Sequence, residues 1–224
     1  MNKLNHVAFI MDGNGRWGLK HKKNRNLGHL EGVNTVKKIV DASIKLNIPI
    51  LTFYVFSSEN WLRPNKEIKY LFKLIYNYFK LELKNIIKND IKINILGRNK
   101  NLPLKIRQIL KKTTELTKNN KKIIVNLAIN YGSKNEIIDS LKKVKSKKIK
   151  INEHSINKCL YTSLPFPDIL VRTGGQKRLS NFMLWQLAYT ELFFLEKLWP
   201  DFNKNDLKNI LKKYSKIKRN FGAV

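Results

Sequence analysis

The feature that most constrains the fold is a regular alternation, along the 224-residue chain, of short apolar runs with longer stretches of helical periodicity. Short apolar runs bounded by turn residues are typical of buried strands. Strands that alternate with helices favour a mostly parallel sheet covered by helices. Because no internal repeat or long linker divides the chain, we expect one α/β domain over residues 1–224, with a central sheet of about six strands.

The apolar runs and the helical periodicity place the individual elements. The strands are expected at 6–11, 50–56, 91–96, 122–129, 168–172 and 192–195. The helices are expected at 29–46, 66–88, 103–118, 133–146, 180–189 and 204–218. The helix over 66–88 carries a second apolar stripe, made of Tyr70, Leu74, Tyr76, Tyr78 and Leu81. A helix that packs one face on a sheet needs only one apolar stripe. The second stripe therefore indicates a partner chain, an apolar ligand cavity or deeper burial, and the sequence leaves all three open.

The formal charge of +29 raises the question of a nucleic-acid partner. Only eight of the 45 basic residues are arginine, and the other 37 are lysines spread over the whole chain. Base recognition relies on arginine, so we expect no specific nucleic-acid partner, and RNA binding is kept as a competing hypothesis. The charge also favours contact with anionic membrane surfaces.

Cysteine use and hydropathy bear on the cellular compartment. Cys159 is the only cysteine, so no intrachain disulfide and no cysteine-rich metal site are expected. No signal-peptide pattern opens the chain, and no apolar run approaches the roughly 20 residues that span a bilayer. We therefore expect a cytoplasmic protein, with peripheral contact at the inner face of the membrane as a further option.

The strongest functional motif is Asp-Gly-Asn-Gly-Arg-Trp at 12–17, directly after the first apolar run. Asp12 is expected at the carboxyl edge of a strand, where open α/β sheets bind their ligands. Glycines let the backbone come close to a ligand, and their N–H groups can surround an anion beside a carboxylate that holds a hard metal ion. The motif predicts a site for a magnesium-bound phosphate or diphosphate; the alternative is an ordinary strand-to-helix turn.

Two further predicted strands end in polar loops. The segment 57–64 combines hydroxyls, a carboxamide, an indole and a guanidinium, which suits either a diphosphate or an N-capping loop before the next helix. The segment 168–181 places Arg172 and Arg178 around a Gly-Gly turn, with Ser180 following. Three donors on a glycine-rich loop suit a second phosphate or diphosphate.

The run Gly28-His29 is expected to open a helix just after Arg25, and a helix N-terminus beside an arginine is a good anion site. Glu191 lies among apolar residues, so a metal or an arginine is its expected partner. Two anion-binding loops, two candidate metal carboxylates and an apolar cavity together indicate prenyl transfer.

These motifs resemble those of the cis-prenyltransferases, most closely the bacterial undecaprenyl diphosphate synthases. The resemblance covers nearly the whole chain in order, through the runs at 11–17, 28–29, 56–64, 130–132, 168–175, 178–186 and 191–202. It implies a parallel-sheet domain with an apolar tunnel, working as a homodimer. The implied reaction extends farnesyl diphosphate with isopentenyl diphosphate units, using Mg²⁺ and forming cis double bonds. The implied product is undecaprenyl diphosphate, the lipid carrier for cell-wall sugars.

The resemblance also implies roles for individual residues. The implied magnesium ligands are Asp12 and Glu191. The groups implied to hold the allylic diphosphate are the amides of Gly13, Asn14, Gly15 and Arg16, together with Arg25, and Trp17 is implied to bind substrate. The isopentenyl diphosphate is implied to bind Arg172, Arg178 and Ser180. The residues implied to assist ionisation, condensation and proton removal are His29, Ser57, Asn60 and Arg63. The residues implied to complete the substrate site are Ser58, Glu59 and Trp61.

Two positions depart from the family pattern. Gln176-Lys177 stands where the family usually has Glu-His, which puts a polar role at position 176 in question. Asn220 stands where the family often has an arginine that reaches the partner subunit's substrate. A third hypothesis is a non-catalytic member that supports a partner subunit. Such members lose the metal aspartate and the loop residues, which this chain retains.

Overall fold

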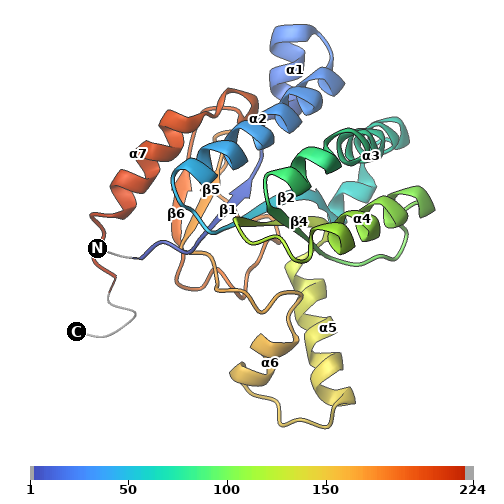
Figure 1. Ribbon diagram of the computed structural model, residues 1–224, viewed down its shortest axis with the longest axis vertical. Coiled ribbons are helices and arrows are strands. Elements are labelled where there is room, and N and C mark those ends of the chain that lie inside the picture. The colour runs from blue at the N-terminus through green and yellow to red at the C-terminus, as the bar shows by residue number, and fades with distance from the viewer. Residues whose placement is uncertain (1–2, 220–224) are drawn as a thin grey trace.

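The computed structural model describes residues 3–219, and a six-stranded sheet lies at its centre (Figure 1). The strands are β1 (His6–Ile10), β2 (Ile50–Ser57), β3 (Ile91–Leu96), β4 (Ile123–Tyr131), β5 (Ile169–Arg172) and β6 (Glu191–Phe194). Their order in the sheet is β3-β4-β2-β1-β5-β6, and every neighbouring pair is parallel. The expected α/β fold with a parallel sheet is confirmed, and all six strands lie where the sequence predicts them.

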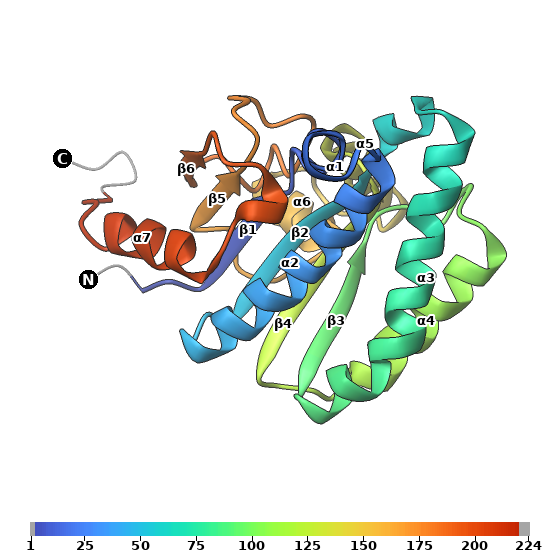
Figure 2. The ribbon, with the colours of Figure 1, turned by 90° about the horizontal axis from the view of Figure 1, so that it is seen from above.

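Helices cover both faces of this sheet. They are α1 (Asn14–Lys22), α2 (Arg25–Lys45), α3 (Asn65–Lys88), α4 (Leu104–Thr117), α5 (Ser133–Ser146), α6 (Glu153–Cys159) and α7 (Lys204–Tyr214), with 3-10 turns η1 (Ser58–Leu62) and η2 (Trp199–Asp201). Figure 2 shows α2, α3, α4 and α7 over one face, with α5 and α6 on the opposite side. Within residues 3–219, no helix has both the length and the hydropathy needed to cross a bilayer.

The sheet separates two apolar cores, because successive side chains of a strand point to opposite faces. On β1, Val7 and Phe9 belong to the larger core, under α2, α3, α4 and α7. The ring of Phe9 stacks on Phe53 with centroids 5.1 Å apart. Ala8 and Ile10 belong to the smaller core on the other face. Since β1 is buried throughout, the residues that follow it are held firmly at the carboxyl edge of the sheet.

The expected helix over 180–189 is wrong. Ser180, Asn181 and Met183 have φ angles of 50°, 61° and 45°, which a right-handed helix cannot contain. The segment is an irregular run of turns that buries Phe182 and Met183 in the smaller core. Its apolar residues suggested a helix, but they serve burial against the sheet.

The sequence pattern predicts neither α1 nor α6, and the helix expected over 29–46 is α2, which begins earlier, at Arg25. Asn24 is the N-cap of α2, because its side chain accepts a hydrogen bond from the Asn26 amide at 2.9 Å. Gly28 lies inside the helix, where a Cβ atom would be 1.9 Å from the carbonyl oxygen of Asn14. The glycine therefore permits close contact of α1 and α2, not the start of a helix.

Candidate active site

A cavity of about 690 Å³ lies at the carboxyl ends of β1, β2 and β5. These strands are neighbours, with β1 between the other two, so the cavity lies where the strand order reverses. Parallel sheets bind their ligands at such a point. Fourteen of the residues singled out from the sequence line the cavity: Asp12, Gly13, Asn14, Gly15, Arg16, Arg25, His29, Ser57, Glu59, Asn60, Arg63, Arg172, Arg178 and Ser180.

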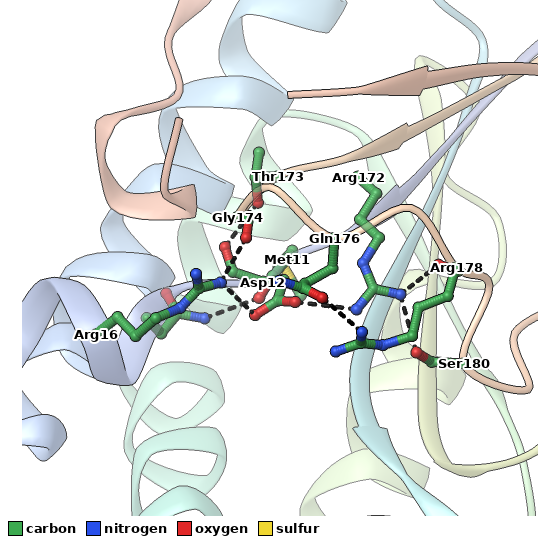
Figure 3. Close-up of polar contacts among 10 residues, drawn as sticks. Met11, Asp12, Arg16, Arg172, Thr173, Gly174, Gln176, Arg178 and Ser180 are labelled. Atoms are coloured by element: carbon green, nitrogen blue, oxygen red, sulfur yellow. Dashed lines mark hydrogen bonds and ion pairs between the residues drawn. The ribbon is translucent and has the colours of Figure 1, made fainter. Parts of the chain in front are cut away.

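Asp12 lies between two arginines (Figure 3). One carboxylate oxygen accepts a hydrogen bond from Arg172 at 2.9 Å, and the other accepts one from Arg16 at 3.3 Å. The same nitrogen of Arg16 donates to the carbonyl oxygen of Gly174 at 2.7 Å. Gly174 has a φ of 87°, and a Cβ atom there would lie 2.5 Å from Arg16. The carboxylate, 28% exposed, is thus presented to the cavity in a fixed orientation.

The loop after β5 forms a second set of donors around the buried Arg172. The guanidinium of Arg172 donates to the Ser180 hydroxyl at 2.8 Å and to the carbonyl oxygen of Arg178. Arg178 donates to the side-chain oxygen of Gln176 at 2.6 Å, so position 176 keeps a polar role despite its departure from the family pattern. Asn220, the other departure, lies outside the described residues. Arg172, Arg178 and Ser180 form one wall of the cavity, and their donor groups suit an anion.

The N-terminus of α1 forms another wall. Gly13 precedes the helix with a φ of 106° and provides no side-chain cap. The first N–H groups of a helix have no acceptor within the helix, so the amides of Asn14, Gly15 and Arg16 are available to an anion. A Cβ atom at Gly15 would lie 2.7 Å from the guanidinium of Arg25, which shows how closely this arginine approaches the turn. The interpretation of this motif as an anion site is therefore supported by its geometry.

The third wall is built around the carboxylate of Glu67, which the sequence motifs do not single out. Glu67, on α3, lies 3.0 Å from Arg63, 3.4 Å from His29 and 3.7 Å from Arg25. Burial lowers the pKa of His29; the charge of Glu67 opposes this shift, and the charges of Arg63 and Arg25 add to it. The four side chains connect α2 to α3 beside the cavity. The one sequence signal for Glu67 is its position four residues after Arg63, since helical ion pairs have this spacing.

The turn η1 combines both roles that the sequence left open for segment 57–64. The amide of Ser57 donates to the side-chain oxygen of Asn60 at 3.0 Å in a capping box, so the N-capping interpretation holds. Ser57, Glu59 and Asn60 also line the cavity, whereas Ser58 does not. Burial alone would raise the pKa of Glu59, but hydrogen bonds from Asn181, from backbone and from the serine hydroxyls outweigh it and hold the pKa below its usual value.

Two tryptophans expected at the substrate site lie outside the lining of the cavity. The indole of Trp17 donates to Asp201 at 2.7 Å. The indole of Trp61 donates to Asn130 at 2.8 Å, and its ring packs 5.5 Å from the ring of Phe72. Trp61 therefore packs against the larger core.

Glu191 is not brought to Asp12. It pairs with Ile169 at the amino end of β5, three positions before the level of Arg172, which corresponds to about 10 Å along a strand. Its carboxylate lies 3.9 Å from the guanidinium of Arg219, so an arginine, one of the two partners expected for Glu191, lies beside it. Within residues 3–219, no cluster of three or more acidic, histidine or cysteine side chains is arranged to hold a metal.

An apolar pocket of about 110 Å³ adjoins the polar cavity. The residues common to both are Met11, Asn14, His29, Val55 and Leu71. Leu74 and Tyr78, from the second apolar stripe of α3, line the pocket, whereas Leu81 is exposed. An apolar cavity, one of the three explanations that the sequence left open, therefore accounts for part of this stripe. The arrangement suits a ligand with a diphosphate at one end and a hydrocarbon chain at the other.

Comparisons with known proteins agree with this geometry. The family model described as "Putative undecaprenyl diphosphate synthase" matches residues 10–222. The isoprenyl transferase of Fusobacterium nucleatum is 44% identical over 220 residues, covering 98% of this chain and 96% of that protein. The isoprenyl transferase of Rickettsia bellii is 45% identical over 224 residues, covering 99% of each.

Two solved structures share the fold. A lavandulyl diphosphate synthase from Lavandula x intermedia, in complex with dimethylallyl diphosphate, has a TM-score of 0.93 and 33% identity, over 97% of this chain and 98% of that chain. A "probable undecaprenyl diphosphate synthase" from Campylobacter jejuni has a TM-score of 0.86 and 36% identity, over 99% of this chain and all of that chain.

Proposed function

Because the chain belongs to the undecaprenyl diphosphate synthase family of prenyltransferases, we propose that it extends farnesyl diphosphate with isopentenyl diphosphate units. We propose further that each addition forms a cis double bond and that the product is undecaprenyl diphosphate. One observation carries this proposal: a single cavity presents anion-binding groups on both sides of Asp12 and adjoins an apolar pocket. Two diphosphates and one hydrocarbon chain match these three compartments.

The allylic substrate is assigned to the wall formed by α1. Its diphosphate would accept hydrogen bonds from the N-terminal amides of α1 and from Arg25. Its prenyl chain would enter the apolar pocket, because Met11 and Val55 line both compartments. This position would leave the bond between C1 and the diphosphate oxygen in the polar cavity, where that bond breaks.

The isopentenyl diphosphate is assigned to the wall formed by Arg172, Arg178 and Ser180. Holding both substrates in one cavity supplies the proximity that a bimolecular condensation requires. In the reaction, C4 of the isopentenyl unit bonds to C1 of the allylic chain, the allylic diphosphate leaves, and a proton departs from C2 of the isopentenyl unit. We assign Ser57 and Asn60 to the assistance of these last steps.

Asp12 fits a magnesium ion bound together with a substrate. Mg²⁺ prefers oxygen ligands and is commonly held by one or two carboxylates together with substrate phosphates. Asp12 supplies one carboxylate, and the surrounding arginines and amides would hold the phosphates. When bound, the ion would neutralise charge on the departing diphosphate. Within one chain Glu191 supplies no second ligand beside Asp12, because it lies beside Arg219 at the amino end of β6, away from the carboxyl edge of the sheet.

The side chains around Glu67 would keep the leaving group oriented. Arg25 and Arg63 flank His29, and burial together with these charges favours its neutral form. Neutral imidazole can donate one hydrogen bond to a phosphate oxygen without adding charge.

We also propose, on the family resemblance, that the chain works as a homodimer in the cytoplasm. Its +29 charge supports peripheral contact with anionic membrane.

Incorporation of radiolabelled isopentenyl diphosphate into farnesyl diphosphate tests the proposal, with and without Mg²⁺ and with products resolved by length. A magnesium-dependent ladder ending near eleven isoprene units is expected, the length that the family name implies. Asp12→Ala is expected to abolish the ladder. Asp41→Ala, at an exposed position of α2 that does not line the cavity, serves as the acidic control. A folded wild-type protein that incorporates no label would refute the proposal, and a different end point would revise the product alone.

A further inference from the structure

Asn181 lies next to Ser180 on the loop after β5, and its polar atoms bind three other segments. Its side-chain nitrogen donates to the carboxylate of Glu59 at 2.7 Å. Its side-chain oxygen accepts from the amide of Lys134 at 2.9 Å, and its carbonyl oxygen accepts from the amide of Ser133 at 2.8 Å. One residue thus connects η1 and the start of α5 to the loop that carries Ser180.

The hydrogen bonds to α5 replace a missing cap. Gly132 precedes α5 and has no side chain to accept from the first N–H groups of the helix. Asn181 supplies both acceptors from a distant part of the chain, so the loop after β5 is attached to the end of a rigid helix. A hydrogen bond from the Leu184 amide to the Ser133 hydroxyl, at 2.9 Å, adds to this attachment.

The backbone at this point adopts a conformation that the loop alone does not favour. Ser180 and Asn181 have φ angles of 50° and 61°, a left-handed region in which residues other than glycine are uncommon. Residues in this region are strained and persist where their surroundings hold them. The Tyr54 hydroxyl lies 3.3 Å from the carbonyl oxygen of Ser180, and Arg172 holds the Ser180 hydroxyl. The orientation of that hydroxyl therefore depends on the anchors around it.

Gly132, from the Asn-Tyr-Gly run, marks where the three segments meet. A Cβ atom there would lie 2.4 Å from the Ser58 hydroxyl and 2.7 Å from the side-chain nitrogen of Asn181. The absence of a side chain at Gly132 lets η1 and the loop after β5 approach each other over the end of β4. This close approach brings Glu59 within reach of Asn181.

We propose that Asn181 is a positioning residue that holds Glu59 and Ser180 as one unit, so that the two loops facing the cavity keep a fixed separation. The inference rests on the proposed function, because it assigns the loop after β5 to isopentenyl diphosphate. It predicts that the hydrogen bond between Asn181 and Glu59 sets the KM for isopentenyl diphosphate. Asn181 itself lines the cavity, and its effect on this KM is assigned to the bond with Glu59.

A double-mutant cycle separates this bond from the capping of α5. Asn181→Asp keeps both acceptors for α5 but turns an oxygen toward the carboxylate of Glu59. We expect the KM for isopentenyl diphosphate to rise about 10- to 100-fold, the factor for losing a hydrogen bond to a charged group, and the KM for farnesyl diphosphate to change less than about threefold. Adding Glu59→Gln restores a donor and an acceptor to the pair, so the KM of the double variant for isopentenyl diphosphate should return most of the way to the wild-type value.

Asn135→Asp is the matched control, since it adds the same charge in the first turn of α5 at a residue that does not line the cavity. It is expected to leave both KM values unchanged. Thermal denaturation accompanies each variant, and Asn181→Asp should unfold cooperatively. Additive effects in the cycle, with an active wild type, would overturn the role of Asn181 alone. An inactive wild type would overturn the proposed function, and this inference with it.

Discussion

The close packing of α1 against α2 determines where the N-terminus of α1 lies, and Gly28→Ala tests it. A Cβ atom at Gly28 would lie 1.9 Å from the carbonyl oxygen of Asn14 and 2.7 Å from the amide nitrogen of Gly18. Both are backbone atoms of α1, so neither can rotate away. Ordinary contact begins near 3.4 Å. The substitution should therefore separate the two helices locally by about 1.5 Å, the difference between 3.4 and 1.9 Å.

The expected loss is larger in activity than in stability. Alanine is favoured over glycine within a helix by about 1 kcal/mol, and overpacking costs about 1–3 kcal/mol. The net change is then at most about 2 kcal/mol, which leaves the protein folded. A misplacement of about 1 Å in a substrate site, by contrast, can lower the rate about 100-fold. We expect kcat/KM for farnesyl diphosphate to fall by about this factor.

Gly32→Ala is the matched control on the same helix. Its Cβ atom would lie 2.1 Å from the side-chain oxygen of Asn14, which can rotate away at a cost of about 1 kcal/mol. It would also lie 3.2 Å from the ring of Trp199, which must shift by only a few tenths of an ångström. We therefore expect less than about a tenfold loss of kcat/KM. The assay is isopentenyl diphosphate incorporation, with thermal denaturation to confirm folding. Equal losses in the two variants, or wild-type activity of Gly28→Ala, would refute the reasoning from helix separation.

Three further results are expected. Glu67→Gln should lower the pKa of His29 further below 6.5 in an NMR titration, because the carboxylate opposes the effect of burial; a raised pKa would contradict the pairing. Burial lowers the pKa of His6 to about 4 in the folded protein, so His6 takes up a proton in the unfolded chain at a higher pH than in the folded one. The contribution of His6 to the free energy of unfolding should therefore fall by about 3 kcal/mol as the pH drops from about 6.5 to about 4. Urea denaturation should show this loss in the wild type and in the exposed variant His154→Gln, but not in His6→Asn. Trp61→Phe should keep the ring contacts, lose one hydrogen bond and cost about 1 kcal/mol by the same denaturation, and unchanged stability would count against that bond.

The sheet was predictable because each strand is an apolar run with its own polar boundary. The placement of Asp12, Ser57 and Arg172 at one cavity followed from the rule that parallel strands present their carboxyl ends at the same edge. No contact between helices was needed for that prediction. Local sequence and topology were therefore sufficient for the centre of the site.

The errors arose where tertiary contacts decide the local structure. The turns near Asn181 follow from hydrogen bonds to α5, more than 40 residues earlier in the chain, which no local pattern reveals. Glu67 joins the site because α3 packs beside α2, and the sequence shows only its spacing from Arg63. Glu191 lies away from Asp12 within one chain because it begins its strand rather than ending it.

The small size of the apolar pocket has a consequence for how product length is determined. An engineered cavity of roughly 150 Å³ holds benzene, a molecule of six carbons, so a pocket of about 110 Å³ holds about one five-carbon isoprene unit. Under the proposed function, a farnesyl chain would fill this pocket and displace part of its lining, which includes residues of α2 and α3, and each added unit would displace more of it. Elongation would then end where displacing the lining costs more free energy than the burial of five further carbons contributes. Product length would depend on how easily α3 moves, not on a fixed depth of the pocket.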